Sequence, residues 1–165
     1  MSLRPGLALA AAVLAADQAS KWFMLDVLLL PEVRHIPLVS LGPFGFDLTM
    51  VWNRGVTFGL LQGEEPWHAW ALAGLAAVIV ALLLRWMAKA EHRRVVLALG
   101  AIIGGAVGNM IDRVRFGAVA DFFDAHAFGW HWYVFNVADA AIVLGVAVLA
   151  WDALFPPKPG GKQAA

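Results

Sequence analysis

The chain has no cysteine and few charged side chains. Only 15% of its 165 residues are Asp, Glu, Lys or Arg, against roughly 25% in soluble proteins. The missing cysteine excludes disulfides, thiolate metal sites and a cysteine nucleophile. The formal net charge is zero, and no cluster of Lys and Arg is interleaved with aromatics, so nothing indicates binding of nucleic acid. Any catalysis must use other groups.

Apolar residues make up 61% of the chain and give a mean hydropathy of +0.72. A helix that crosses ~30 Å of hydrocarbon needs roughly 20 mostly apolar residues. Four segments qualify, at about 5–25, 67–88, 95–112 and 133–155. Without a repeat or a second domain, this predicts a single-domain, all-α integral membrane protein with four transmembrane helices. The third segment is short, so its ends are expected near the two interfaces.

The first segment has a second interpretation, as a secretory signal peptide. Arg4 precedes an apolar run, and Ala15 and Ala16 are the small residues expected at a cleavage site. Apolar sequence resumes at Trp22, after the polar stretch 17–21. This favours a span that functional residues interrupt.

Basic residues predict the orientation in the membrane, because short cytoplasmic loops are enriched in Lys and Arg. They occur between the second and third segments and near both termini: Arg85, Lys89, Arg93 and Arg94, then Arg4, Lys158 and Lys162. Both termini are therefore expected in the cytoplasm, and the loops at about 26–66 and 113–132 outside it. Residues 46–52 alternate like a strand, which predicts a small sheet at the outer membrane surface. The Pro- and Gly-rich tail at 156–165 is expected to be disordered.

Ionisable residues inside spans are costly, so each one is a functional hypothesis. Asp17 and Lys21 lie one helical turn apart, and an anchoring ion pair is the simpler interpretation. Asn109 and Arg113 have the same spacing near the outer interface, where a helix-end hydrogen bond and a snorkelling Arg would also explain them. In the fourth segment, Asn136 and Asp139 share one face.

Asp121 lies among apolar residues just before the fourth segment, on the side where the third segment ends. If it meets Asp139 there, the two carboxylates cannot both be ionised and must share one proton, as in aspartic proteases. The ionised member would accept a proton from attacking water, and the protonated member would donate to a peptide carbonyl. Asn53, Asn136 and Arg113 could position the substrate. Neither a metal nor a covalent intermediate is needed.

Three alternatives use the same residues differently. Asp121, Asp124, His126 and His131 could bind a metal, although their spacing matches no tight metal motif. Asp17, Lys21 and Asp139 could relay protons in a small carrier. Gly100, Gly104 and Gly108, spaced by four, could serve only to pack helices in a scaffold protein.

Five stretches in order, along almost the whole chain, resemble motifs of the lipoprotein signal peptidases, also called signal peptidase II. This is a family of bacterial intramembrane aspartic peptidases. The stretches are 17–21, 53–59, 104–113, 117–122 and 135–139.

The resemblance implies a protein of the bacterial inner membrane without cofactor or metal, whose active site lies near the extracytoplasmic face. It implies removal of the signal peptide from prolipoproteins, before a cysteine that carries diacylglycerol. Asp121 and Asp139 would be the catalytic pair, and the outer loop would form a small sheet and a short helix over the substrate. Supporting residues would be Asn53, Gly55, Asn109, Arg113, Asn136, Asp17 and Lys21.

The chain departs from the family at three places. Trp132, Tyr133 and Val134 stand where a proline is frequent before Phe135, which affects how the fourth span begins. Ala120 replaces a larger β-branched residue beside Asp121, and Thr57 replaces a small Ala. Oligomeric state is not readable from the sequence, since the glycines could pack within or between chains; a monomer is expected.

Overall fold

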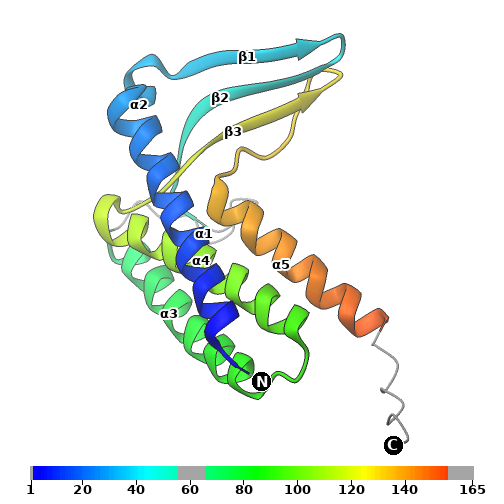
Figure 1. The fold of residues 1–165 in the computed structure, drawn as a ribbon. Coiled ribbons are helices and arrows are strands. Elements are labelled where there is room, and N and C mark those ends of the chain that lie inside the picture. The colour runs from blue at the N-terminus through cyan, green and yellow to red at the C-terminus, as the bar shows by residue number, and fades with distance from the viewer. Residues whose placement is uncertain (1, 56–65, 156–165) are drawn as a thin grey trace, which may run out of the picture.

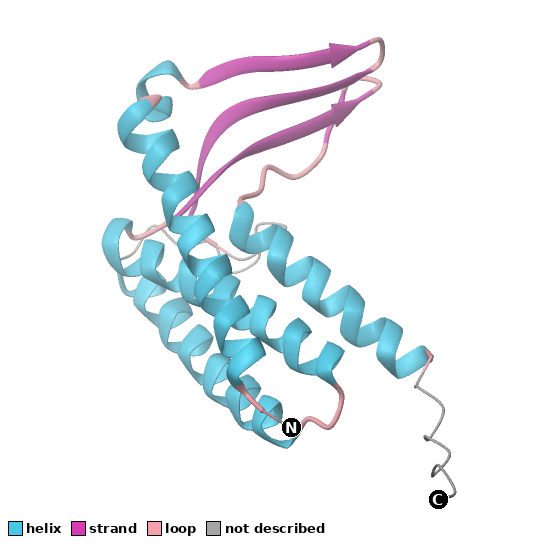
Figure 2. Ribbon diagram, in the orientation of Figure 1, coloured by secondary structure: helices cyan, strands magenta, loops and turns pink. Residues whose placement is uncertain are grey.

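The computed structural model describes residues 2–55 and 66–155. A helical bundle is topped at one end by an antiparallel sheet (Figures 1 and 2). The first helix, α1, spans Arg4–Trp22 and continues through a π-helical turn, η1 (Phe23–Val27), into the short helix α2 (Leu30–Val33). The long helices are α3 (Pro66–Lys89), α4 (Arg93–Phe116) and α5 (Val137–Leu154).

Three helices of the described part are long and apolar enough to cross a membrane: Trp67–Lys89, Arg93–Phe116 and Val137–Leu154. The expected span 67–88 agrees with the first of these. The expected short span 95–112 lies within α4, which is longer and continues to Phe116. The helix stops where Gly117 takes the left-handed conformation (φ 71°), which favours glycine. Helix α1 does not meet this criterion of length and apolar content.

The expected span 133–155 is wrong at its beginning, because residues 133–136 are not helical. Phe135 instead pairs with Phe123 through two backbone hydrogen bonds. Asn136 then caps α5: its side chain accepts from the N–H of Asp139, whose carboxylate accepts from the N–H of Asn136. Asp139 therefore lies in the first turn of α5. This pairing also sets how α5 begins, at the place where the family's proline is absent.

The sheet contains four antiparallel strands in the order β1-β2-β3-β4. The predicted strand 46–52 is confirmed and is longer, as β2 (Phe44–Asn53). The others are β1 (His35–Leu41), β3 (Val119–Ala127) and β4 (Trp130–His131). Residues 113–132, expected as an outer loop, provide the end of α4 and two strands.

Helix α4 lies at the centre of the bundle because glycines let α1 and α5 approach it closely. A Cβ on Gly104 would lie 2.5 Å from the Ala10 carbonyl oxygen of α1, and one on Gly105 equally close to the Ala138 carbonyl oxygen of α5. The three glycines spaced by four, Gly100, Gly104 and Gly108, all face α1 and therefore pack helices within one chain. An apolar cluster joins η1 and α2 to the sheet: Met24, Leu30, Leu48, Met50, Ala120 and Phe122.

Candidate active site

Asp121 and Asp139 are brought together because β3 and α5 both begin at the sheet end of the bundle. Strand β3 starts at Val119, directly after the turn that ends α4, and Asp121 is its third residue. The start of β3 is buried, with Asp121 only 1% exposed, and so are Asn136 and Ala138 beside Asp139. The β-bridge between Phe123 of β3 and Phe135, two residues before α5, holds the two elements next to each other.

The side chain of Asn136 links the two aspartates. Its Oδ1 accepts from the N–H of Asp139 at 2.9 Å, so its Nδ2 is the atom that faces Asp121. That nitrogen donates to Asp121 Oδ1 at 2.6 Å. Asn136 is fully buried, and its hydrogen bonds specify one orientation of the amide.

Lys21 lies at the centre of a buried ion cluster that supports this pair. Its Nζ lies 2.8 Å from carboxylate oxygens of both Asp17 and Asp112, and donates to Asn109 Oδ1 at 3.2 Å. All three ammonium hydrogens therefore have an acceptor. Since lysine can only donate, Asn109 must turn its oxygen to Lys21 and its nitrogen to Asp139. The Asn109 Nδ2 donates to Asp139 Oδ1 at 2.7 Å.

The two carboxylates of this cluster also hold the backbone next to each paired aspartate. Asp17 Oδ1 accepts from the N–H of Ala138 at 3.0 Å, and Asp112 Oδ2 accepts from the N–H of Ala120 at 3.1 Å. These residues directly precede Asp139 and Asp121. One buried cluster therefore positions both aspartates through the main chain, as well as through Asn109.

Strand β2 closes the site on its other side. The Nδ2 of Asn53 donates to Asp121 Oδ2 and to the Tyr133 hydroxyl, each at 3.0 Å. Asn53 Oδ1 accepts from the N–H of Gly55 at 3.1 Å. Arg113 Nη2 donates to the Gly55 carbonyl at 2.9 Å, while its buried Nε has no partner in the described part of the chain.

The electrostatics of the pair favour retention of one proton. Burial, and next the nearby Asp139 carboxylate, raise the pKa of Asp121 to about 7, although hydrogen bonds from Asn53 and Asn136 oppose the shift. Titration of Asp121 therefore lies close to neutral pH. A buried carboxyl pair in this state offers one group that accepts a proton and one that donates it.

The two histidines that could have bound a metal, His126 and His131, pair with two different aspartates. His131 pairs with Asp124 at 2.9 Å, and His126 pairs with Asp47 at 3.0 Å. Burial alone would raise the pKa of Asp124, but hydrogen bonds from His131 and Thr49 outweigh it and lower that pKa. Within residues 2–55 and 66–155, no three His, Asp or Glu side chains are grouped as metal ligands.

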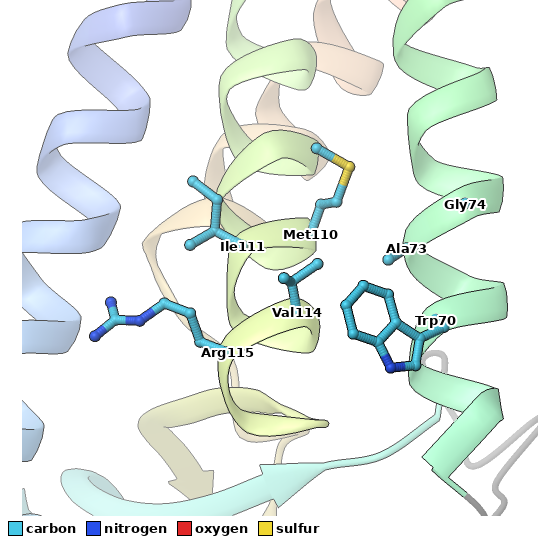
Figure 3. A pocket seen from close by; sticks show the side chains of 7 residues that line it. All are labelled: Trp70, Ala73, Gly74, Met110, Ile111, Val114 and Arg115. Carbon is cyan, nitrogen blue, oxygen red and sulfur yellow. The ribbon is translucent and has the colours of Figure 1, made fainter.

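A separate apolar hollow of about 380 Å³ lies between α3 and α4. Figure 3 shows Trp70 and Val114 facing each other across it. It lies on the face of α4 turned away from Asn109 and Asp112, as the helical spacing requires. The hollow is therefore distinct from the polar site. Its lining is Trp70, Ala73, Gly74, Met110, Ile111, Val114 and Arg115.

All nine residues expected at the site take part in one connected set of contacts. Residues 56–59 of the second motif, including Thr57, lie outside the described residues, as do the rest of 56–65 and the expected tail 156–165. Sequence reasoning missed three members of the network: Gln18, Asp112 and Tyr133. Asp112 could have been found, because it follows Asn109 by three residues on one helix face. No sequence pattern indicates that Tyr133 reaches Asn53.

Comparison with known proteins agrees with this architecture. The model of the family described as signal peptidase (SPase) II, Peptidase_A8, matches residues 9–155. The lipoprotein signal peptidase of Methylobacterium sp. (strain 4-46) is 51% identical over 155 residues, covering 94% of this chain and 92% of the relative. That of Nitrobacter hamburgensis is 44% identical and covers 97% of each chain.

Two solved structures, both of bacterial membrane enzymes, have the same fold. One, at 2.3 Å resolution, has a TM-score of 0.76 at 24% identity and covers 97% of this chain and 93% of its own. The other, at 1.9 Å, has a TM-score of 0.71 at 25% identity, with coverage of 93% and 94%.

The apolar helices and the matching family are those of a multi-pass membrane protein of the bacterial inner membrane. The chain belongs to the signal peptidase II family, and it is thus a protease. The resemblance seen in the five sequence motifs is confirmed.

Proposed function

We propose that this protein is an intramembrane aspartic endopeptidase that removes the signal peptide from diacylglyceryl-modified prolipoproteins. Cleavage falls before the lipid-modified cysteine. The name of the relatives, lipoprotein signal peptidase, supports the substrate class. The observation that carries the mechanism is the placement of Asp121 and Asp139 on either side of one buried asparagine, Asn136.

In the proposed reaction, the pair holds one proton between its two carboxyls. The ionised carboxylate takes a proton from water as the water oxygen attacks the peptide carbonyl carbon. The protonated carboxyl donates to the carbonyl oxygen, giving a tetrahedral intermediate. When the C–N bond breaks, the newly protonated carboxyl donates its proton to the leaving amine nitrogen. The other carboxylate takes a proton from a hydroxyl of the intermediate, so the pair again holds one proton. Arg113 donates to the Gly55 carbonyl and so positions the residues that follow β2 beside the pair.

The same proposal includes four spans, with α1 as the first. Helix α1 runs beside α4 (Figure 1) and buries Asp17 and Lys21 against it, which accounts for its lower apolar content. Both termini would then be cytoplasmic and the paired aspartates would lie near the extracytoplasmic face. A monomer suffices, since the ion cluster and both aspartates come from one chain. The chemistry requires no cofactor.

The test is cleavage of a diacylglyceryl-modified prolipoprotein by the purified protein in lipid. Asp121→Asn and Asp139→Asn keep the side-chain shape but remove the titrating carboxyl. Each should lower kcat by ~10² to 10⁴-fold, the range that general acid–base catalysis contributes. Asp124→Asn, the same change three residues further along β3, is the matched control and should retain activity. Each protein is assayed with and without EDTA.

The proposal stands if both variants lose turnover while remaining folded and EDTA has no effect. Near-native activity in either variant would exclude the paired-aspartate mechanism. Loss of native activity on chelation would return the reaction to the metal alternative.

A further inference from the structure

The end of the sheet farthest from the bundle exposes a group of large apolar side chains, here called the sheet tip. Its members come from the β1–β2 and β3–β4 turns and are mostly accessible: Leu41 (71%), Phe44 (56%), Phe128 (72%) and Trp130 (82%). The two turns lie together. The N–H of Phe128 donates to the Pro43 carbonyl at 2.7 Å, and the rings of Phe44 and Phe128 meet edge to face with centroids 5.3 Å apart.

The sheet tip carries no charge. Residues 38–46 and 127–130 contain no Asp, Glu, Lys or Arg, and the neighbouring Asp47 and His126 pair with each other. A contiguous apolar surface of this kind marks an interaction site. Tryptophan and phenylalanine are typical of segments that enter the boundary between lipid headgroups and acyl chains.

The sheet tip lies on the side of the molecule where α5 begins. Trp130 precedes the start of α5 at Val137 by seven residues, so it lies within ~25 Å of that helix end along a fully extended chain. The strands run across the end of the bundle and extend past it on the side of α5 (Figure 1). Along α5, Val143, Leu144 and Val146 are exposed as a lipid-facing surface would be.

We propose that the sheet tip inserts into the outer leaflet of the bilayer, beside α5, at the level of the lipid headgroups. The occupant of this apolar surface is lipid. The consequence is mechanical, because β2 and β3 run from the sheet tip to Asn53 and Asp121. Contact with the membrane would hold the sheet at its free end, opposite the end fixed by the bundle. This inference rests on the proposed orientation in the membrane but not on the proposed reaction.

The absence of cysteine permits a site-specific test. Single-cysteine variants Phe128→Cys and Trp130→Cys are labelled with the fluorophore NBD, and the full chain is reconstituted into phosphatidylcholine–phosphatidylglycerol vesicles. Glu32→Cys, at an exposed acidic residue of α2, is the control outside lipid, and Val146→Cys on α5 is the control within it. Quenching by lipids that carry a doxyl group near the headgroup is measured for each.

We expect NBD at positions 128 and 130 to be quenched at least three-fold more strongly than at position 32, with emission blue-shifted toward that of position 146. Quenching no stronger than at position 32 would overturn the proposal. So would protection that appears only as protein density in the vesicles rises, since a second copy of the chain would then be the partner.

Discussion

Lys21 shows at the scale of one residue why a charge can be buried in this bundle. Its ammonium is 3% exposed and has three acceptors, two of them the carboxylates of Asp17 and Asp112. Removing one partner of a buried ion pair costs more than the pair contributes, because the remaining charge stays buried. Here removal would leave two carboxylates facing each other.

Lys21→Met is therefore expected to lower the free energy of unfolding by ~3–5 kcal/mol. Lys89→Met, at an exposed lysine near the end of α3, is the matched control and should change it little. Denaturant unfolding in one detergent would compare the two. A loss below about 1 kcal/mol for Lys21→Met would mean that water solvates the cluster.

Tyr133 contributes a hydroxyl that shares the Asn53 amide with Asp121. Tyr133→Phe removes that acceptor and leaves Asn53 less firmly oriented. One neutral hydrogen bond is worth ~1 kcal/mol, so kcat/KM should fall about five-fold. Trp132→Phe, next to it and exposed, is the control. Equal activity of Tyr133→Phe and the native protein would show that the hydroxyl does not position Asn53 during turnover.

The raised pKa of Asp121 predicts the pH dependence of the reaction. Because the group is protonated below about pH 7 and ionised above it, the pair loses its shared proton as pH rises through that value. In the proposed mechanism kcat/KM should then decline on the alkaline side, with an apparent pKa near 7. Asp124→Asn should keep the same profile. Undiminished kcat/KM up to pH 9 would contradict the assignment.

At the scale of elements, the sequence predicts the bounds of a helix well where contact with lipid alone determines its apolar residues. Helix α3 was located to within one residue at each end, because its surroundings require only apolar length. The predicted start of α5 is wrong, because the residues before it are apolar but not helical, and Phe135 pairs with Phe123 of β3. Strand β3 was missed because it is buried on both faces, so its residues do not alternate in polarity.

The site could be predicted as a set of residues but not as a network. Asp121 and Asp139 stood out because carboxylates among apolar neighbours are costly. The contacts of Asp17 and Asp112 with the N–H groups of Ala138 and Ala120 depend on how three helices and a strand meet. No local pattern encodes such backbone partners.

Close helix packing at α4 gives a prediction for its glycines. A Cβ at position 105 would lie 2.5 Å from the Ala138 carbonyl oxygen, next to Asp139, whereas one at Gly74 of α3 would meet nothing within 4 Å. Gly105→Ala should destabilise the protein by ~1–3 kcal/mol through overpacking and reduce activity. Gly74→Ala should be neutral or stabilising, since alanine favours helix. Similar unfolding curves for both variants would show that α5 can shift freely.

On the scale of the whole molecule, the structure has two distinct ends. At one end Gly6 of α1 lies against Met87 and Val96, near the α3–α4 connection. Arg94 also forms an ion pair there with Asp152 of α5. The sheet and α2 lie at the other end (Figure 1). If α1 crosses the bilayer with the other helices, these two ends must face opposite sides of the membrane.

Cysteine accessibility can decide between three spans and four, since the native chain has no cysteine. With Ser2→Cys, Glu91→Cys and Glu32→Cys in intact spheroplasts, a membrane-impermeant maleimide should label only position 32. Positions 2 and 91 should react after permeabilisation, because basic residues near both hold them in the cytoplasm. Labelling of position 2 in intact spheroplasts would mean that α1 does not cross. The N-terminus would then lie outside, although Gly6 packs beside the α3–α4 connection, which is expected in the cytoplasm. The buried cluster of Asp17, Lys21 and Asp112 would have to form in that arrangement.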